Sequence, residues 1–343
     1  MMISFESDYN NGAHPSVLRH LVETNNLQSA SYGYDQWSQQ AREKIRQACE
    51  CPDADIFFLV GGTQTNATVI DAMLCSYEGV VAATTAHINV HESGAVEASG
   101  HKVITLLTHQ GKMAPQELAD YLKAFHSDPT WEHMVFPGMV YITFPTELGT
   151  IYRSCEIEQI YATCQQHSIP LFIDGARLGY GLAAEGCDIT LPWLARHCDA
   201  FYIGGTKVGA LCGEAVVFPK GAPKGFFTIV KRHGALLAKS RLAGVQFDTL
   251  FTVGLYLTIA RHAIDMAMQV RQLFIEAGIE VKDSPTNQQF VVLTNQQMER
   301  LLRHVLFETW EPVDAERTLC RFVTSWATTD ANLQALSSAL RQL

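Results

Sequence analysis

A single lysine, Lys207, stands among glycines and apolar residues in the stretch FYIGGTKVGALCGEAVVF, residues 201–218. Burial disfavours the charged form of an ammonium group, and the neutral amine is a nucleophile toward carbonyl carbons. Gly204, Gly205 and Gly209 would let the backbone approach a ligand closely. Lys207 is therefore a candidate for a Schiff-base lysine. The alternative is an ordinary loop lysine beside a glycine turn.

A carboxylate and a guanidinium follow another apolar run, in FIDGARLGYG, where Asp174 precedes Arg177 by three residues. Open α/β sheets bind ligands beyond the carboxyl ends of their strands. An aspartate at such a position can pair with the pyridinium nitrogen of pyridoxal phosphate and keep the ring an electron sink. The alternatives are a helix N-cap or an internal ion pair with Arg177.

Two further motifs also follow predicted strands. In FFLVGGTQTNATVIDAM, Gly61, Gly62 and Thr63 stand where a helix begins, and free N–H groups at a helix N-terminus bind phosphate. The alternative is a plain capped turn. In TTAHINVHESGA, His87 and His91 are four residues apart, but no third ligand follows and no H-E-x-x-H motif is present. We expect no metal site, and a histidine there could stack on a cofactor, transfer a proton or be purely structural.

Two arginines are candidates for binding a substrate carboxylate. Arg321 lies within the apolar segment CRFVTSW, and a guanidinium there suits bidentate capture of a carboxylate. Arg241 in AKSRLAG is a weaker candidate of the same kind. The alternative for both is an ordinary surface arginine.

Apolar runs alternate with segments of helical period, which predicts a mostly parallel sheet covered on both faces. The expected strands are 56–60, 80–84, 103–107, 140–144, 171–173, 200–203 and 215–218, and the expected helices are 66–77, 115–125 and 156–166. Four of the motifs above follow such strands, so their side chains are expected at one edge of one sheet.

The domain organisation changes after about residue 224, where a long helical stretch is followed by short strands and helices. This pattern predicts a small α+β domain. We expect an N-terminal helical segment at 1–50, a large α/β domain at 51–245 and a small C-terminal α+β domain at 246–343.

The composition restricts the possible classes of function. The 343 residues carry a formal net charge of −10 and no Lys/Arg-rich run, which disfavours nucleic-acid binding. No apolar run approaches the roughly 20 residues that a bilayer requires, and no signal peptide is recognisable. Nine scattered cysteines are typical of buried thiols in a reducing compartment, so we expect a cytoplasmic protein.

The ordered motifs resemble the low-specificity L-threonine aldolases, pyridoxal-phosphate enzymes of the aspartate-aminotransferase-like fold type I. The resemblance covers nearly the whole chain, through FESDYNNGAHP, YGYDQW, GGTQTN, TAHINVHESGA, GKMAPQEL, TELGTIY, IDGARL, GGTKVG, GEAVVF and RFVTSW. It implies an α/β fold with a large, mostly parallel domain and a small C-terminal domain. It also implies cleavage of L-threonine, L-allo-threonine or related β-hydroxy-α-amino acids, such as phenylserine, to glycine and an aldehyde.

The resemblance also implies roles for particular residues. Lys207 would carry the cofactor, His87 would stack on its ring, Asp174 would pair with the ring nitrogen and Arg177 would reach the ring hydroxyl. The phosphate would be held by Gly62 and Thr63, helped by Gln64 and Thr206. The substrate carboxylate would be held by Ser7 and Arg321. Tyr32 would reach the site of a neighbouring subunit, which implies a homodimer or homotetramer with shared active sites.

One departure concerns the base for the substrate hydroxyl. Many relatives have a histidine where this chain has Glu147 in PTELG, so Glu147, His87 or a held water could accept the proton. The alternatives are a β-eliminating lyase, racemase or aminotransferase with the same cofactor, a silent cofactor-binding protein, and a nucleotide-binding oxidoreductase. The last is disfavoured because the chain lacks a dinucleotide-binding fingerprint.

Overall fold

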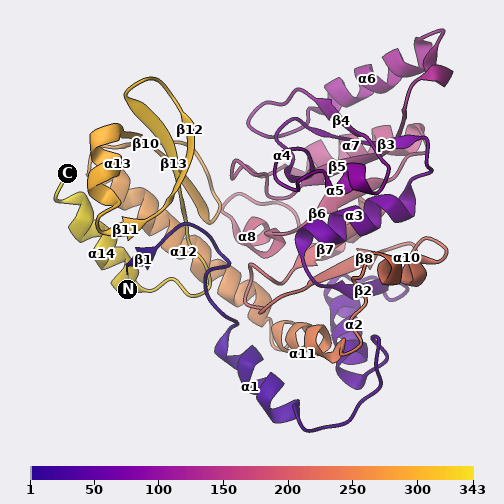
Figure 1. The fold of residues 1–343 in the computed structure, drawn as a ribbon, viewed down its shortest axis with the longest axis horizontal. Coiled ribbons are helices and arrows are strands. Elements are labelled where there is room, and N and C mark those ends of the chain that lie inside the picture. The colour runs from indigo at the N-terminus through magenta and orange to yellow at the C-terminus, as the bar shows by residue number, and fades with distance from the viewer. Residues whose placement is uncertain (1) are drawn as a thin grey trace.

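A seven-stranded sheet forms the centre of the larger part of the molecule in the computed structural model, which describes residues 2–343 (Figure 1). Its strand order is β2-β8-β7-β6-β5-β3-β4. The neighbours from β4 through to β7 pair in parallel, whereas β8 is antiparallel to both β7 and β2. The strands are β2 (Asp55–Leu59), β3 (Glu78–Ala83), β4 (Val103–Leu106), β5 (Phe136–Thr143), β6 (Leu171–Asp174), β7 (Ala200–Gly204) and β8 (Glu214–Phe218). The expectation of a mostly parallel sheet is confirmed.

The sheet is buried on both faces because its strands are apolar at successive positions rather than at alternate ones. All residues of β6, β7 and β8 are buried. Neighbouring side chains enter opposite layers, as Phe172 and Tyr202 do in one core and Ile173 and Phe201 do in the other. This pattern is typical of strands covered by helices on both sides.

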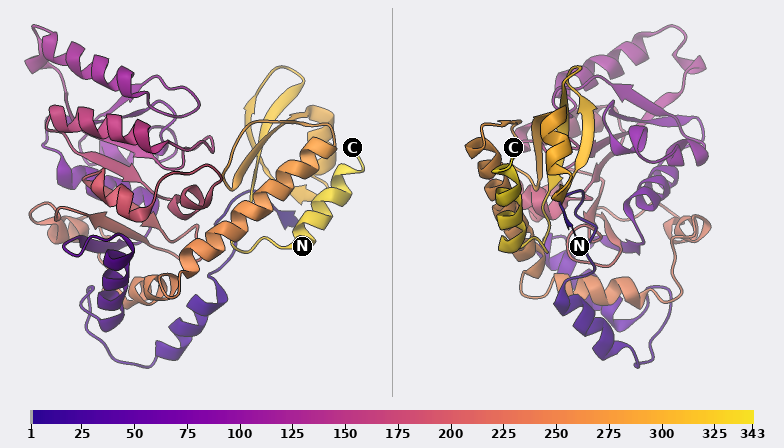
Figure 2. Two further views of the ribbon diagram at one scale, coloured as in Figure 1. Left: turned by 180° about the vertical axis from the view of Figure 1, so that it is seen from behind. Right: turned by 60° about the vertical axis from the view of Figure 1, so that its left-hand side comes forward.

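The helices of the larger part lie on the two faces and beyond one edge of the sheet (Figures 1 and 2). The two helices α1 and α2 precede the sheet in the chain and pack against α11. The helices are α1 (Pro15–Thr24), α2 (Gln36–Ala48), α3 (Gly62–Met73), α4 (His87–Val90), α5 (Ala95–Ala98), α6 (Pro115–Ser127), α7 (Ser154–Gln166), α8 (Leu178–Ala183), α9 (Leu191–Arg196), α10 (Phe226–Arg232) and α11 (Arg241–Leu250), with a 3₁₀ turn at Trp131–His133.

A second, smaller sheet of order β12-β13-β10-β9 lies beside the first and is antiparallel throughout. The long helix α12 (Leu255–Glu276) runs from the larger part to this sheet (Figure 2). The other elements are β9 (Glu280–Val281), β10 (Gln288–Thr294), α13 (Asn295–Leu301), β11 (Val305–Leu306), β12 (Glu308–Pro312), β13 (Arg317–Val323) and α14 (Asp330–Leu340).

The N-terminal segment connects the two parts. Strand β1 (Ile3–Ser4) pairs in parallel with β11, and the chain then crosses to α1 below the larger sheet (Figure 1). Within residues 2–343 no single helix is long and apolar enough to cross a membrane. Only α11 and α12 taken together have the length and composition of a candidate membrane span, and the chain bends by 70° between these two helices.

Candidate active site

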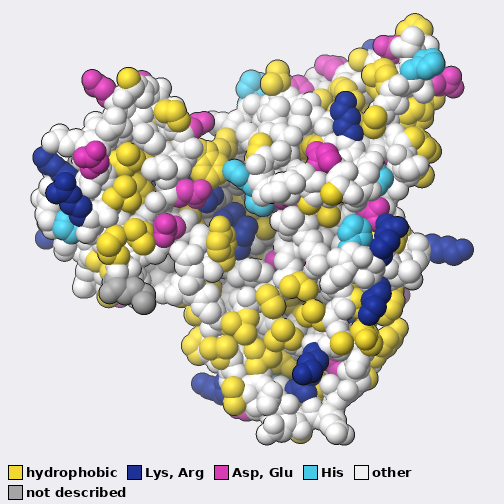
Figure 3. Space-filling view, in the orientation of Figure 1, with side chains coloured by type: hydrophobic (Ala, Val, Ile, Leu, Met, Phe, Trp, Pro, Cys, Tyr) yellow, Lys and Arg dark blue, Asp and Glu magenta, His cyan; other side chains and the backbone are white. Residues whose placement is uncertain are grey.

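The sequence motifs that follow strands meet in one pocket at the carboxyl edge of the larger sheet. The pocket lies where β5, β6 and β7 end, as expected for an open α/β sheet. It is lined by Gly62, His87, Glu92, Thr143, Pro145, Glu147, Asp174, Ala176, Arg177, Tyr202 and Lys207. An adjoining depression shares His87, Glu147, Arg177 and Lys207 and adds Tyr9, His91, Glu308, Trp310 and Arg321. Figure 3 shows histidine and charged side chains gathered in the hollow between the two parts of the molecule.

Lys207 is held by a tight loop between the antiparallel strands β7 and β8. The N–H groups of Gly205 and Thr206 both donate to the carbonyl of Gly213, at 3.0 and 3.1 Å. A Cβ atom on Gly205 would come within 2.6 Å of that carbonyl oxygen, so only glycine fits there. The loop therefore keeps the lysine backbone close to the sheet edge.

The charge state of Lys207 is shifted by its surroundings. Burial lowers the pKa of its amine to about 8, and the neighbouring Arg177 acts in the same direction. Asp8, Asp174 and Glu214 oppose this shift. A substantial fraction of the amine is thus neutral near pH 8, which is the form that attacks a carbonyl carbon.

Asp174 is buried at the end of β6 and accepts hydrogen bonds from several sides. Tyr202 Oη donates to one carboxylate oxygen at 2.5 Å, and Asn66 Nδ2 donates to the other at 2.9 Å. Tyr141 Oη also donates to that second oxygen, and the N–H of Ala176 bonds to the first. The carboxylate is therefore fixed in place before any ligand binds.

Arg177 pairs with Asp8 and not with Asp174. Its Nε and Nη2 atoms donate to the two Asp8 carboxylate oxygens at 2.7 and 3.0 Å. Asn287 Nδ2, from the smaller part of the molecule, donates to Asp8 at 2.9 Å. Asp8 is a site residue that the sequence reasoning missed, because nothing in the local motif FESDYNNG indicates a partner 169 residues away.

His87 begins the short helix α4 and is held at two points. Its ring Nδ1 lies 2.8 Å from Glu92 Oε1, and its backbone N–H donates to Glu147 Oε1 at 2.9 Å. Thr143 Oγ1 donates to the same Glu147 oxygen at 2.7 Å. Burial raises the pKa of Glu147, so its carboxyl group holds a proton more readily than an exposed glutamate does.

Glu92 lines the pocket but was not predicted from the sequence, although it follows His91 directly. Among residues 2–343, no group of three His, Cys, Asp or Glu side chains is arranged to hold a metal ion. His87 and His91 have ring centroids 5.6 Å apart.

The N-terminus of α3 opens beside this pocket. Gly61 is its N-cap and Gly62 lines the pocket, while Thr63 is exposed. The helix has twelve residues, and the first N–H groups of any α-helix lack partners within that helix. Gln64 lies nearby but donates to the carbonyl of His233 at 3.3 Å, and the hydroxyl of Thr206 accepts from Gly213 N.

Arg321 is buried on β13 and faces the adjoining depression. Its Nη1 donates to Gln288 Oε1 at 2.8 Å, its Nη2 bonds to Glu308, and its guanidinium lies 4.6 Å from the Trp310 ring centroid. Its Nε is buried and has no hydrogen-bond partner among the residues that the structure describes. Arg321 therefore has bonding capacity left, in a position suited to an anionic ligand.

Thr63, Gln64 and Thr206 are not among the residues that line either depression. Three further sequence-predicted residues also do not line the pocket of their own chain. Ser7 Oγ donates to Asn10 at 2.7 Å. Arg241 donates to the carbonyls of Leu27 and Thr24 and lies 4.3 Å from the Trp37 ring centroid.

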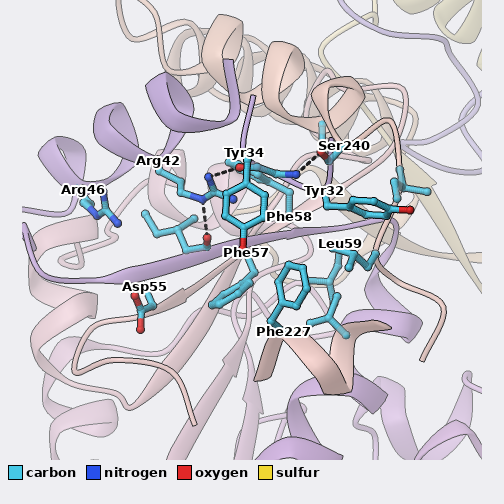
Figure 4. Close-up of a pocket in the computed structure, with 16 residues that line it drawn as sticks. Tyr32, Tyr34, Arg42, Arg46, Asp55, Phe57, Phe58, Leu59, Phe227 and Ser240 are labelled. Atoms are coloured by element: carbon cyan, nitrogen blue, oxygen red, sulfur yellow. Dashed lines mark hydrogen bonds between the residues drawn. The ribbon is translucent and has the colours of Figure 1, made fainter. Parts of the chain in front are cut away.

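Tyr32, the third of these residues, lines a different and roomier pocket together with Tyr34, Phe57 and Phe227 (Figure 4). That second pocket contains neither Lys207 nor Asp174. We therefore place the chemistry in the smaller pocket, which contains both of them.

The comparisons with known proteins decide the family. Residues 5–301 match the family described as beta-eliminating lyase. The chain belongs to the beta-eliminating lyase family. Two curated relatives, low specificity L-threonine aldolases of a Pseudomonas species and of Pseudomonas aeruginosa, are each 30% identical over 98% of this chain and 96% of the relative. The resemblance that the motifs indicated is thus confirmed.

Solved structures agree with this beta-eliminating lyase assignment. Leishmania major threonine aldolase superposes with a TM-score of 0.94 at 37% identity, covering 99% of both chains. Aspartate aminotransferase of Thermus thermophilus has a TM-score of 0.70 at 15% identity, covering all of this chain and 92% of the other, and so shows the fold alone. The expected aspartate-aminotransferase-like α/β fold is confirmed, and with it the expectation of a lyase.

Proposed function

We propose that this chain is a pyridoxal-phosphate-dependent aldolase. It cleaves L-threonine, L-allo-threonine or related β-hydroxy-α-amino acids between Cα and Cβ, releasing glycine and an aldehyde. The observation that carries the proposal is Lys207, whose amine has a pKa lowered to about 8 and lines one pocket with the buried carboxylate of Asp174. The membership of this chain in the beta-eliminating lyase family supports the same reaction class.

The donor set of the pocket fits pyridoxal phosphate. A neutral amine suits its aldehyde, a fixed carboxylate suits its ring nitrogen, and a helix N-terminus suits its phosphate. Lys207 would hold the aldehyde carbon, Asp174 the ring nitrogen, Arg177 the ring hydroxyl and His87 the ring face. Gly62, Thr63, Gln64 and Thr206 would hold the phosphate. When bound, the cofactor supplies an electron sink for negative charge at the substrate Cα.

The remaining residues act on the substrate. Arg321, with Ser7, binds the substrate carboxylate, and the spare bonding capacity of its buried Nε supports this role. Fixing the carboxylate also fixes which bond at Cα faces the electron sink. Glu147 or His87 accepts the proton of the β-hydroxyl group, since both line the pocket beside Lys207.

We further propose that the active unit is a homodimer or homotetramer with shared sites. Tyr32 is 39% exposed and lies in a pocket separate from Lys207, so a role at an active site requires a neighbouring subunit. Segments 51–245 and 246–343 act as the large and small domains, with 1–50 as an N-terminal segment. The free cysteines, found at all nine positions, suit the reducing cytoplasm.

Product analysis tests the proposed reaction against its rival, β-elimination. The cofactor-loaded protein is incubated with L-threonine, L-allo-threonine and L-phenylserine, and the products are identified. Acetaldehyde and glycine from threonine are expected. Release of 2-oxobutanoate and ammonia would assign β-elimination instead.

Lys207→Ala is expected to abolish turnover, while Lys224→Ala, at an exposed lysine in the following loop, is the matched control and should keep it. Turnover by the Lys207→Ala protein would contradict the role of this amine.

A further inference from the structure

A buried glutamate, Glu92, lies beside the pocket without a role in the reaction proposed above. Its side chain has no exposed surface. It follows α4, and the next two residues, Ser93 and Gly94, both have positive φ angles of 52° and 73°. A left-handed conformation at a serine is uncommon and needs support from surrounding contacts. The turn thus directs Glu92 inward at some conformational cost.

One oxygen of Glu92 receives two hydrogen bonds. Oε1 lies 2.8 Å from His87 Nδ1 and 2.8 Å from Asn66 Nδ2. The same Asn66 nitrogen donates to Asp174 Oδ2 at 2.9 Å. Only the NH₂ end of an amide can donate to two carboxylates, so the orientation of Asn66 is determined by its partners. A continuous chain therefore links His87, Glu92, Asn66 and Asp174.

This arrangement determines where a neutral His87 ring carries its proton. With a carboxylate oxygen as its partner, Nδ1 must be the donor. The other ring nitrogen, Nε2, then has a free lone pair, and it has no hydrogen-bond partner within the described part of the chain. The ring lines both the pocket of Lys207 and the adjoining depression, and its side chain is 35% exposed.

We propose that Glu92 is the positioning residue of His87. It holds the ring proton at Nδ1, so that Nε2 faces the pocket as a proton acceptor. Asn66 couples this pair to the carboxylate of Asp174. The proposal rests on the proposed function only for its kinetic consequence, since the tautomer of His87 is a property of the protein without cofactor or substrate.

A purely structural role explains the contacts less well. Glu92 Oε2 is buried and has no hydrogen-bond partner among residues 2–343. A buried carboxylate with an unsatisfied oxygen costs free energy that an apolar side chain of similar size would not. An orienting effect of this carboxylate on the His87 ring accounts for a charged side chain at this position.

The direct test is ¹⁵N NMR of the histidine side chains in the cofactor-free protein at a pH where the His87 ring is neutral. Comparison with a His87→Asn protein identifies the signals of His87 among the 13 histidines. The Nδ1–H tautomer is expected for the unaltered protein. Observation of the Nε2–H tautomer would overturn the proposal, and this measurement needs no variant of Glu92 that folds.

Variants of Glu92 then separate the effect of its negative charge from the effect of its hydrogen-bond acceptor. Glu92→Gln keeps a carbonyl oxygen for His87 Nδ1, so the tautomer should persist. Glu92→Leu removes the acceptor, so a mixture of tautomers should appear. Glu97→Gln, at an exposed glutamate five residues later, is the control and should behave as the unaltered protein. An unchanged tautomer in a folded Glu92→Leu protein would overturn the proposal.

Kinetics of the loaded protein give a second readout. If His87 transfers the substrate proton, a mixture of tautomers should lower kcat with little change in KM, and by less than the roughly 10²–10⁴-fold that removal of a general base costs. Glu92→Gln should lose less than Glu92→Leu. Equal losses in the two variants would contradict an orienting role. The absence of aldol cleavage in every protein would contradict the proposed function but would not affect the NMR result.

Discussion

At the residue scale, the chemistry of the pocket depends on charges that come from distant parts of the chain. Three of the charges that shift the pKa of Lys207 are Asp8 of the N-terminal segment, Arg177 of the loop after β6 and Glu214 of β8. Burial also raises the pKa of Glu214 to about 8, and Glu214 Oε2 accepts a hydrogen bond from Gly205 at the base of the lysine loop. The site thus contains a buried acid whose pKa is raised and a buried amine whose pKa is lowered.

The lowered pKa of Lys207 predicts a pH dependence that can be measured without cofactor. The amine is protonated below about pH 8 and neutral above it, against an ordinary value of 10.5, so it should react with an amine-directed reagent increasingly as pH passes 8. The measurement is the labelling rate of the peptide containing residue 207, read by mass spectrometry from pH 6 to 10. A midpoint close to 10.5 would show that burial does not shift the amine. The Lys207→Arg protein, which lacks the target, identifies the peptide.

At the element scale, the loop carrying Lys207 is joined to α11, because the N–H of Leu211 in that loop donates to Gln246 Oε1 of α11 at 2.6 Å. Helix α11 lies against α2, and Gly244 is the point of close approach (Figure 1). A Cβ atom there would lie 2.6 Å from the backbone nitrogen of Ser38. That nitrogen donates to Asp35, the N-cap of α2, at 2.8 Å.

Gly244→Ala is therefore expected to destabilise the fold. The added methyl group must push α2 away or break its N-cap bond, and overpacking of this kind typically costs about 1–3 kcal/mol. The measurement is the free energy of unfolding from denaturant titration. Gly12→Ala is the control, because a Cβ atom at this exposed glycine meets no atom within 4 Å. Equal stability of the two variants would show that the helices adjust freely.

At the scale of the whole molecule, the site lies between two units joined by few segments. Helix α12 and the N-terminal crossing from β1 to α1 connect the larger sheet to the smaller one (Figure 2). Arg321 comes from the smaller unit, while Lys207 and Asp174 come from the larger. Movement of one unit relative to the other would therefore change the distance between the proposed carboxylate and cofactor sites.

Shared sites in an oligomer predict complementation between two defective chains. If Tyr32 serves a neighbouring site, a mixture of Lys207→Ala and Tyr32→Ala subunits forms hybrids in which one site carries both changes and another carries neither. Each variant alone should be nearly inactive, and unfolding and refolding them together should restore part of the activity. No recovery, despite hybrid formation shown by differently tagged subunits, would place Tyr32 outside the shared site.

The sequence alone determined the type of sheet, the strand ends that carry chemistry and the residues that meet there. These follow from local rules, because apolar runs specify buried strands and glycines specify tight turns. Lys207, Asp174 and His87 accordingly line one pocket, and Glu147, which the family resemblance indicated, lines it as well. The first turn of α3 was placed four residues late because the polar GGTQTN segment has no apolar periodicity.

Only the tertiary structure decided which groups pair with the site residues. Asp8 with Arg177, Glu308 with Arg321 and Asn66 with Asp174 are far apart in the chain, and nothing local specifies them. The tertiary structure also placed Tyr32 and Arg241 away from the pocket of their own chain. Such pairings depend on how strands and helices pack, and the pKa of each group follows from that packing because burial and neighbouring charges set it.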